Sequence, residues 1–399
     1  MTENRVIVAG AGPAGLVAAA LLADEGIPVL IVEQARDLPD DLRASTFHPP
    51  TLDMLDRFGV TGAMIEQGLI CPTWQFRDRH TGVIATFDLG HLKDDTNHPY
   101  RLQCEQWRLT RMLRDRLATN PGVTFLYDAK AVEVAQDADG VTLTVERADG
   151  SREPLGGRYL IGADGASSAV RKSLGIGFEG ETIPEIFLTL STTFAFHDAI
   201  DDLTNIAYIS DPEEWFVLLR TASLWRVLFP TDPEAVPARL LSDEFIQERL
   251  GRLASHAGPF DVRHRTLYDV HQRVARTYHA GRVLLMGDAA HINNPLGGMG
   301  MNGGLHDAFN LGDKLVAILR GDAGEEALDR YDRQRRRIAL DFVQEHTIRN
   351  KRLMEEHDPQ QQQRRQAEFM RIAADPAESR AFLMKTSMID SLRAAAAIE

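Results

Sequence analysis

Short apolar runs and helical patterns alternate from the beginning of the chain. Residues 5–9 (RVIVA) form an apolar, β-branched run, residues 16–26 (LVAAALLADEG) are rich in Ala and Leu, and residues 28–33 (PVLIVE) form a second apolar run. Further apolar runs at residues 159–162 and 283–286 lead into Gly-rich turns and helical patterns. This order of strand, turn and helix predicts βαβ organisation and an α/β fold.

The middle of the chain has a different pattern. IFLTLSTTFAF, NIAYIS, EEWFVLLRT and SLWRVLFPT are strand-like runs separated by turn residues between positions 186 and 231, and they predict a mostly antiparallel sheet. Residues 123–147 alternate apolar and polar positions around an Asp-Gly turn, which predicts an antiparallel meander. From residue 326 onward the pattern is helical and heavily charged, and we interpret its RQRRR stretch as a solvated helix face because acidic residues flank it.

Composition and charge exclude several classes of protein. The 399 residues carry 44 Lys and Arg against 58 Asp and Glu, a net charge of −14, which argues against a nucleic-acid binder. The sequence has no apolar run long enough for a transmembrane helix and no secretory signal pattern at its start, so we expect no membrane span and a cytoplasmic protein. Cys71 and Cys104 suggest neither a metal site nor a disulfide scaffold.

The first Gly-rich turn, GAGPAG at residues 10–15, is typical of a dinucleotide site. Gly10 permits a tight turn, Gly12 lets a pyrophosphate approach the backbone, and Gly15 lets the following helix pack on the strand. The helix N-terminus offers free N–H groups to the phosphates. Glu33, at the end of the second strand, predicts a carboxylate on ribose hydroxyls and excludes a 2′-phosphate, so FAD or NAD is favoured over NADP. A Gly-rich turn without a ligand is the alternative.

Two more motifs follow in order. Residues 159–171 read YLIGADGASSAVR, and residues 282–302 read RVLLMGDAAHINNPLGGMGMN, in which Asp288 follows a buried strand. Together with GAGPAG, these motifs resemble the single-component flavoprotein aromatic hydroxylases of the para-hydroxybenzoate hydroxylase fold over about residues 1–345. The resemblance implies a Rossmann-like FAD-binding domain with an inserted, mostly antiparallel β-sheet substrate domain and C-terminal helices.

The resemblance also gives a division of the chain. We expect residues 1–70, 100–180 and 276–345 to form the FAD-binding domain, residues 71–99 and 181–275 to form the substrate-binding domain with one sheet face over the flavin, and residues 346–399 to form a C-terminal helical segment. The last 40 or so residues would form one or two helices that pack on the body of the protein or on a second subunit, and a homodimer is our expectation.

The resemblance places specific residues against FAD. Asp288 would hydrogen-bond the ribityl chain, and residues 295–302 would line the isoalloxazine ring at the start of a helix beginning near Asn302, where the helix N-terminus favours the negative charge of reduced flavin. His291 is interpreted as structural, packed under this loop. The residues expected to bind FAD are Gly10, Gly12, Pro13, Ala14, Gly15, Glu33, Arg43, Gln106, Asp164, Asp288, Pro295, Gly298, Gly300, Met301 and Asn302.

Three of these assignments have alternatives. Asp164, with Arg171, would serve FAD and the approach of NAD(P)H, or Asp164 holds the turn between strand and helix. Arg43 matches a family Arg that contacts FAD, or it is a surface residue without a role. Gln106 matches a family Gln near the ribityl or phosphate groups, and Gln103 is the alternative.

The activity implied by the resemblance is hydroxylation of a small aromatic molecule with FAD, O2 and NAD(P)H as co-substrate, through a flavin C4a-hydroperoxide. A flavin-dependent reductase or dehydrogenase on the same fold and a non-catalytic FAD-fold scaffold are the rivals. Candidates for activating the aromatic ring are His48, Tyr208, Arg220 and His197, each with a structural role as the alternative. Arg220 would pair either with a substrate carboxylate or with a local acidic residue.

Overall fold

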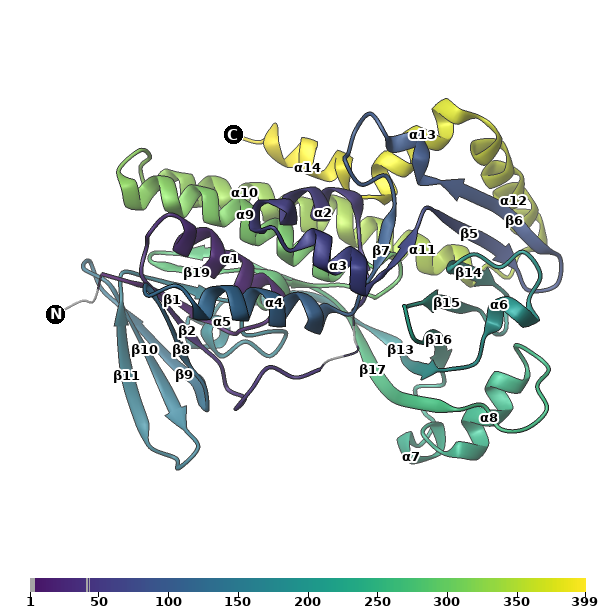
Figure 1. Ribbon diagram of the computed structural model, residues 1–399, viewed down its shortest axis with the longest axis horizontal. Coiled ribbons are helices and arrows are strands. Elements are labelled where there is room, and N and C mark those ends of the chain that lie inside the picture. Colours follow the sequence, from purple (N-terminus) through teal and green to yellow (C-terminus); the bar gives the residue numbers. More distant parts are fainter. Residues whose placement is uncertain (1–3, 41, 43) are drawn as a thin grey trace.

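The computed structural model describes residues 4–40, 42 and 44–399, and Figure 1 shows two lobes side by side. The first, the parallel-sheet lobe, is built on β1, which pairs in parallel with both β2 and β12. The apolar runs of the sequence form these strands, and every residue of β1 is buried. In spatial order the described strands of this sheet are β18 (His279–Ala280), β19 (Val283–Leu285), β12 (Tyr159–Gly162), β1 (Val6–Ala9), β2 (Val29–Val32) and β8 (Val123–Leu126).

Helices cover this parallel sheet. α1 (Pro13–Asp24) lies between α4 (Gln106–Ala118) and α9 (Met299–Arg320). It is apolar on nearly all sides because it is enclosed by the sheet and by these two helices. The predicted α/β fold is therefore confirmed for this lobe.

A small antiparallel sheet and α5 (Ala169–Ser173) lie beside the same lobe. The sheet consists of β9 (Ala129–Gln136), β10 (Val141–Arg147) and β11 (Arg152–Gly157). The predicted meander over residues 123–147 is thus only partly right. Its first strand, β8, pairs in parallel with β2, because those apolar residues extend the central sheet.

The second lobe is built on a mostly antiparallel sheet, as predicted. Its strand pairs are antiparallel except for β14 with β5, among the residues described. The long strands β13 and β17 pair with each other and lead from the first lobe into the second (Figure 1). In spatial order the strands are β20 (His291–Ile292), β17 (Val262–Ala275), β13 (Phe178–Thr192), β16 (Trp225–Thr231), β15 (Phe216–Arg220), β14 (Ile206–Ser210), β5 (Thr73–Asp78) and β6 (Gly82–Asp88).

Shorter elements connect the lobes. β7 pairs with both β3 and β4 and lies near the junction in Figure 1. β20 belongs to the antiparallel sheet although it directly follows η3 at the end of β19, so the third motif joins the two sheets. The remaining elements before α9 are β3 (Thr46–Phe47), α2 (Pro49–Leu55), η1 (Asp56–Phe58), α3 (Thr61–Gln67), β4 (Leu69–Cys71), η2 (Leu89–Leu92), β7 (Arg101–Gln103), α6 (Phe196–Ala199), α7 (Pro237–Leu240), α8 (Asp243–Gly251) and η3 (Gly287–Ala289).

The C-terminal helices pack on the body of the protein. α10 (Glu326–Ile338) continues through a π-helical turn (Ala339–Gln344) into α11 (Glu345–Met354). α12 (Pro359–Ala374) and α13 (Pro376–Thr386) cover β6 and η2, and α14 (Ile389–Ala396) returns to α10 (Figure 1). The segment therefore holds more helices than the one or two expected.

These helices complete a hydrophobic core. Phe369 of α12 and Leu383 of α13 are buried in one cluster with Trp74, Phe87 and Phe187 of the antiparallel sheet. Each fully buried side chain of this kind contributes about 1.5–3 kcal/mol of hydrophobic free energy. α12 and α13 are thus an integral part of the second lobe. A search of the described helices for one that is both long and apolar enough to cross a bilayer finds none.

Candidate active site

The turn after β1 has the geometry of a phosphate cradle. Gly10 adopts a φ of +105°, in the left-handed region that favours glycine, and a Cβ there would collide with the carbonyl oxygen of Ala163. A Cβ at Gly15 would collide with the carbonyl oxygen of Gly10, so the helix reaches the strand only because both residues are glycine. Gly12, the N-cap of α1, faces open space. Pro13 and Ala14 begin the helix, whose free N–H groups meet that space, and the turn therefore fits a pyrophosphate.

Glu33 stands beside this turn at the end of β2. Its Oε2 accepts a hydrogen bond from the backbone N–H of Ala11 at 2.9 Å, and its Oε1 accepts one from Ala35 at 2.9 Å. These two bonds fix the carboxylate next to the Gly-rich turn. Each oxygen keeps a lone pair, so the group fits two ribose hydroxyls.

The other predicted residues of the adenosine and ribityl region differ in their surroundings. Arg43 lies outside the described residues. Gln106 is half-buried at the first position of α4. Gln103 is buried, and its side-chain amide accepts from Ser45 at 2.8 Å and donates to Thr46 at 2.9 Å. Since Gln103 is engaged inside the protein, the geometry favours Gln106 for a cofactor contact, which stays a prediction.

The second motif is held together by its own polar residues. The carboxylate of Asp164 accepts hydrogen bonds from the Ser168 hydroxyl at 2.5 Å and from the Val170 N–H at 3.1 Å. Buried Arg171 donates to the carbonyl oxygens of Ala289 at 2.7 Å and Ala166 at 2.8 Å, tying this motif to the third. These bonds are the ones expected of a turn residue at Asp164. Its contact with FAD stays a prediction.

The third motif begins at the strand end where α/β sheets bind ligands. Asp288 follows β19 in η3 and is exposed. Pro295 is exposed too, and its carbonyl oxygen accepts the N–H of Gly298. Gly297 and Gly298 adopt φ values of +105° and +67° just before α9, which begins at Met299, earlier than the start expected near Asn302.

The first turn of α9 therefore consists of Met299, Gly300 and Met301, and its N–H groups are those available to a flavin ring. Asn302 locks the loop in place. Its side-chain oxygen accepts the N–H of His48 at 3.0 Å, and its amide donates to the carbonyl oxygens of Thr46 and Gly298. The loop thus fits the flat end of a flavin, with Asn302 as its buried anchor.

A buried charged cluster lies beneath this loop. The carboxylate of Asp307 accepts hydrogen bonds from the Gly287 N–H at 3.0 Å, from His291 at 2.7 Å and from Arg335 at 2.6 Å. His291 has the packed position that the sequence suggested. Arg335 contradicts the interpretation of RQRRR as a wholly solvated face, because its side chain is 2% exposed and reaches inward to Asp307. An acidic residue on the apolar face of α9 was the available signal for a buried partner.

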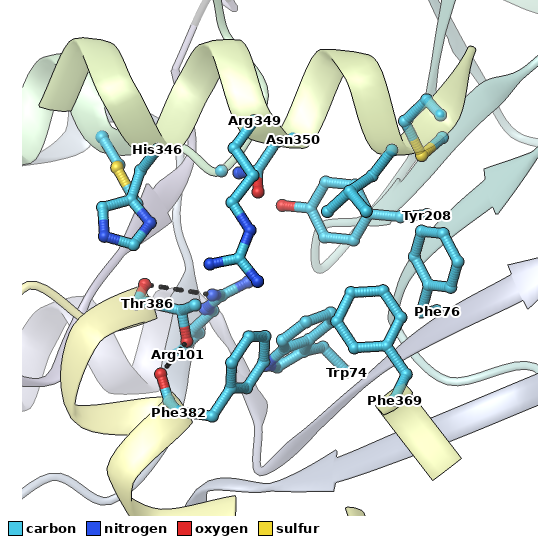
Figure 2. Close-up of a pocket in the computed structure, with 14 residues that line it drawn as sticks. Trp74, Phe76, Arg101, Tyr208, His346, Arg349, Asn350, Phe369, Phe382 and Thr386 are labelled. Atoms are coloured by element: carbon cyan, nitrogen blue, oxygen red, sulfur yellow. Dashed lines mark hydrogen bonds between the residues drawn. The ribbon is translucent and has the colours of Figure 1, made fainter. Parts of the chain in front are cut away.

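We call residues 295–302 the flavin loop. A pocket opens where this loop meets the antiparallel sheet. Gly297 and Met299 of the loop form one side, and α11 forms another with His346, Arg349 and Asn350 (Figure 2). The described residues that complete its lining are Trp74, Phe76, Arg101, Tyr208, Leu353, Met354, Phe369, Phe382 and Thr386. Most of this wall is aromatic or aliphatic, as a site for an aromatic ring requires.

The four candidates for ring activation are placed differently. Tyr208, on β14, lines the pocket, with its ring edge-to-face on Trp74 at 5.7 Å between centroids. His48 is buried behind the loop and its Nε2 donates to the Gly297 carbonyl at 2.9 Å. Burial, reinforced by Arg101, holds the pKa of His48 well below its usual value, so it is neutral. Arg220 bonds Asn205, His197 accepts from Trp225, and neither lines this pocket.

Sequence reasoning missed much of the pocket wall. Arg101 and Trp74 lie outside the recognised motifs, and the residues of α11, α12 and α13 belong to a segment interpreted only as packing helices. The available signal was the apolar positions around Phe369 and Phe382, which give the charged C-terminal helices an apolar side.

Comparison with known proteins gives the family. A family model described as an FAD binding domain matches residues 3–346. The chain belongs to this FAD-binding domain family. The region matched contains the three Gly-rich motifs of the FAD-binding domain family and all four candidates for ring activation.

Relatives within the FAD-binding domain family are aromatic hydroxylases. The para-nitrophenol 4-monooxygenase of Pseudomonas sp. (strain WBC-3) is 33% identical over 398 residues, which are 98% of this chain and 97% of the relative. The 6-hydroxy-3-succinoylpyridine 3-monooxygenase of Pseudomonas putida (strain DSM 28022 / S16) is 33% identical over 349 residues, 86% of each chain. The crystal structure of p-nitrophenol 4-monooxygenase from Pseudomonas putida DLL-E4 matches with a TM-score of 0.92 and 32% identity over 98% of both chains. This chain is an FAD-dependent aromatic monooxygenase, as the resemblance implied.

Proposed function

We propose that this monooxygenase hydroxylates a small phenol, bound in the pocket between the flavin loop and the antiparallel sheet, with NAD(P)H as the reductant. The observation that carries the proposal is the meeting of loop residues Gly297 and Met299 with the aromatic wall of Trp74 and Tyr208. A ring held there lies next to the helix N-terminus assigned to the flavin. The relatives' names, para-nitrophenol and hydroxypyridine monooxygenases, support a hydroxylated aromatic substrate.

Bound FAD would supply the activation of oxygen, and the chain supplies position and a dry environment. The aromatic side chains of the wall orient the substrate ring and exclude water. The hydroxyl of Tyr208 points across the pocket toward Arg349 (Figure 2). That position supports a hydrogen bond between this hydroxyl and the phenolic oxygen of a bound substrate, which would orient and activate the ring.

The proposal is tested on purified, FAD-loaded protein with a panel of phenols. Each compound is added with NADH or NADPH while oxygen uptake, reductant oxidation and hydroxylated product are measured together. We expect at least one para-substituted phenol to stimulate all three, and non-phenolic analogues of the same size to stimulate none. Reductant oxidation that proceeds without oxygen uptake would instead favour the reductase alternative.

Removing the Tyr208 hydroxyl should impair hydroxylation without loss of FAD. Tyr208→Phe keeps the contact with Trp74 but deletes the hydrogen bond to an ionised phenol, worth about 1.5–3 kcal/mol, so kcat/KM should fall about 10- to 100-fold. Product formed per NAD(P)H consumed is the second measurement. Tyr100→Phe, outside the pocket, is the control and should behave as the parent. An unchanged kcat/KM and unchanged coupling would remove Tyr208 from the mechanism.

A further inference from the structure

Arg101 is a buried cation at the pocket for which the described part of the chain provides no acidic partner. It lies on β7 with 2% of its surface exposed. Its Nη2 donates to the carbonyl oxygen of Thr386 at 3.5 Å, a long contact. The groups that act on its charge are Tyr208 and Cys71, and no described carboxylate is among them. Its Nε and Nη1 are buried without a hydrogen-bond partner among the described residues.

A buried guanidinium without a counter-charge destabilises the folded protein unless a bound group supplies that charge. Burial lowers the pKa of Arg101, and Tyr208 opposes that shift, but a guanidinium remains protonated in proteins. The guanidinium lies over the Trp74 ring at 5.2 Å, which offsets part of the cost by a cation–π contact. Arg101 lines the pocket, and its Nε and Nη1 still lack a partner among the described residues. A buried charge without a partner is strongly unfavourable. A bound anion would provide the missing partner.

The charge on the rest of the pocket lining is also positive. Arg349 of α11 reaches into it above Arg101 (Figure 2), and among the described lining residues there is no Asp or Glu. This contrasts with the net charge of −14 of the whole chain. A pocket with two guanidinium groups and aromatic walls suits an aromatic anion.

We propose that Arg101 binds the ionised oxygen of the phenolic substrate and thereby makes the pocket selective for acidic phenols over neutral aromatics. Arg349 adds to the same positive field from the exposed side of the pocket. This inference rests on the proposed function, because it assumes that the substrate ring occupies this pocket. Arg101 is thus assigned as a specificity-determining residue.

The test compares 4-nitrophenol with 4-nitroanisole, its methyl ether, which keeps the ring and the nitro group but cannot ionise. Binding of each to the FAD-loaded protein is followed by the flavin absorbance change. The ionisation of bound 4-nitrophenol is followed separately by the colour of the phenolate. We expect 4-nitrophenol to bind at least about 10-fold more tightly, and to ionise at least about one pH unit lower when bound than when free, as beside a cation.

Three variants locate the effect. Arg101→Met keeps an apolar stem on Trp74 and should weaken 4-nitrophenol binding about 10- to 100-fold while leaving 4-nitroanisole within a few-fold of the parent. Arg101→Lys keeps the charge, and its affinity for 4-nitrophenol should lie between those of the parent protein and Arg101→Met. Arg352 lies on the exposed face of α11, one turn from Arg349 and outside the pocket. Arg352→Met therefore removes a charge outside the pocket and should leave the affinity for both ligands unchanged.

The outcomes separate this inference from the proposed function. Equal binding of the two ligands to the parent protein, or an equal loss for both in Arg101→Met, would mean that the ring or the nitro group is recognised, and it would overturn the role of Arg101. If neither ligand binds, the comparison is repeated with each phenol of the panel and its methyl ether, and the proposed function itself fails if no phenol binds. If Arg101→Met does not retain FAD, the ligand pair and the bound ionisation in the parent protein still decide.

Discussion

Replacing Asp307 with asparagine should lower the free energy of unfolding by about 3–5 kcal/mol, one of the largest effects expected of any substitution outside the cofactor site. The carboxylate is completely buried and is the ion-pair partner of Arg335, itself 2% exposed. An amide leaves the guanidinium buried without a counter-charge. It also weakens the bonds to Gly287 and His291, which lie at the start of the third motif, so FAD retention should fall with stability.

The pH dependence gives an independent check of the same cluster. Burial raises the pKa of Asp307, but His291 and Arg335 outweigh it and hold that pKa well below its usual range. A carboxyl group with a depressed folded-state pKa stabilises the protein above its unfolded pKa of about 4 and loses that contribution as the pH falls further. Below pH 4 the parent protein should therefore lose stability more steeply than Asp307→Asn.

Urea unfolding of the two proteins at neutral and acidic pH measures both effects. Asp313→Asn is the matched control, because Asp313 is on the same helix, pairs with Arg57 at the surface and keeps 65% of its side chain exposed. It should shift stability by less than about 1 kcal/mol. A second variant, Arg335→Met in the Asp307→Asn background, should recover part of the loss. If Asp307→Asn lowered the free energy of unfolding no more than Asp313→Asn does, the structural role of the buried cluster would be contradicted.

The parts of the fold that the sequence predicted are those determined by local patterns. The strand, turn and helix at β1, α1 and β2 need only an apolar run, three glycines and an Ala/Leu-rich segment, all contiguous in the chain. The contact of Gly15 with the Gly10 carbonyl is local too, but the need for glycine at Gly10 comes from the distant backbone of Ala163, which the parallel pairing of β1 with β12 brings close. The strand, loop and helix of the third motif are also contiguous in the chain. The loop's two positive φ values nevertheless let α9 begin earlier than its Gly-rich start suggested.

The pocket could not be predicted in the same way because its residues come from distant parts of the chain. Trp74 and Tyr208 are brought together by the parallel pairing of β5 with β14, which no local pattern encodes. Phe382 comes from a short helix far along the chain, and its burial against Trp74 and Phe87 depends on the sheet that this helix covers. Arg101 and Arg335 look like solvated charges in the sequence, and only tertiary packing shows that they are buried.

Introducing valine at Gly12 should abolish FAD retention while leaving the fold intact. Gly12 has extended backbone dihedrals that valine adopts without strain, and a Cβ there meets no described protein atom within 4 Å. The added side chain would instead fill the space in front of α1 that the pyrophosphate is expected to occupy. Loss of two hydrogen bonds to charged oxygens, at about 1.5–3 kcal/mol each, predicts at least a 100-fold weaker affinity for FAD.

The measurement is the dissociation constant for FAD of the apoprotein, with thermal unfolding of the same apoprotein as the check on the fold. Gly62→Val is the matched control, since Gly62, in α3 (Thr61–Gln67), also faces open space and lies outside the Gly-rich motifs. It should bind FAD as the parent does. Gly15→Val should differ from Gly12→Val in the stability of the apoprotein. Its side chain would collide with the Gly10 carbonyl, so the apoprotein itself should unfold at a lower temperature. Normal FAD affinity in Gly12→Val would show that the cofactor phosphates do not lie at this turn, because only a ligand would meet the new side chain.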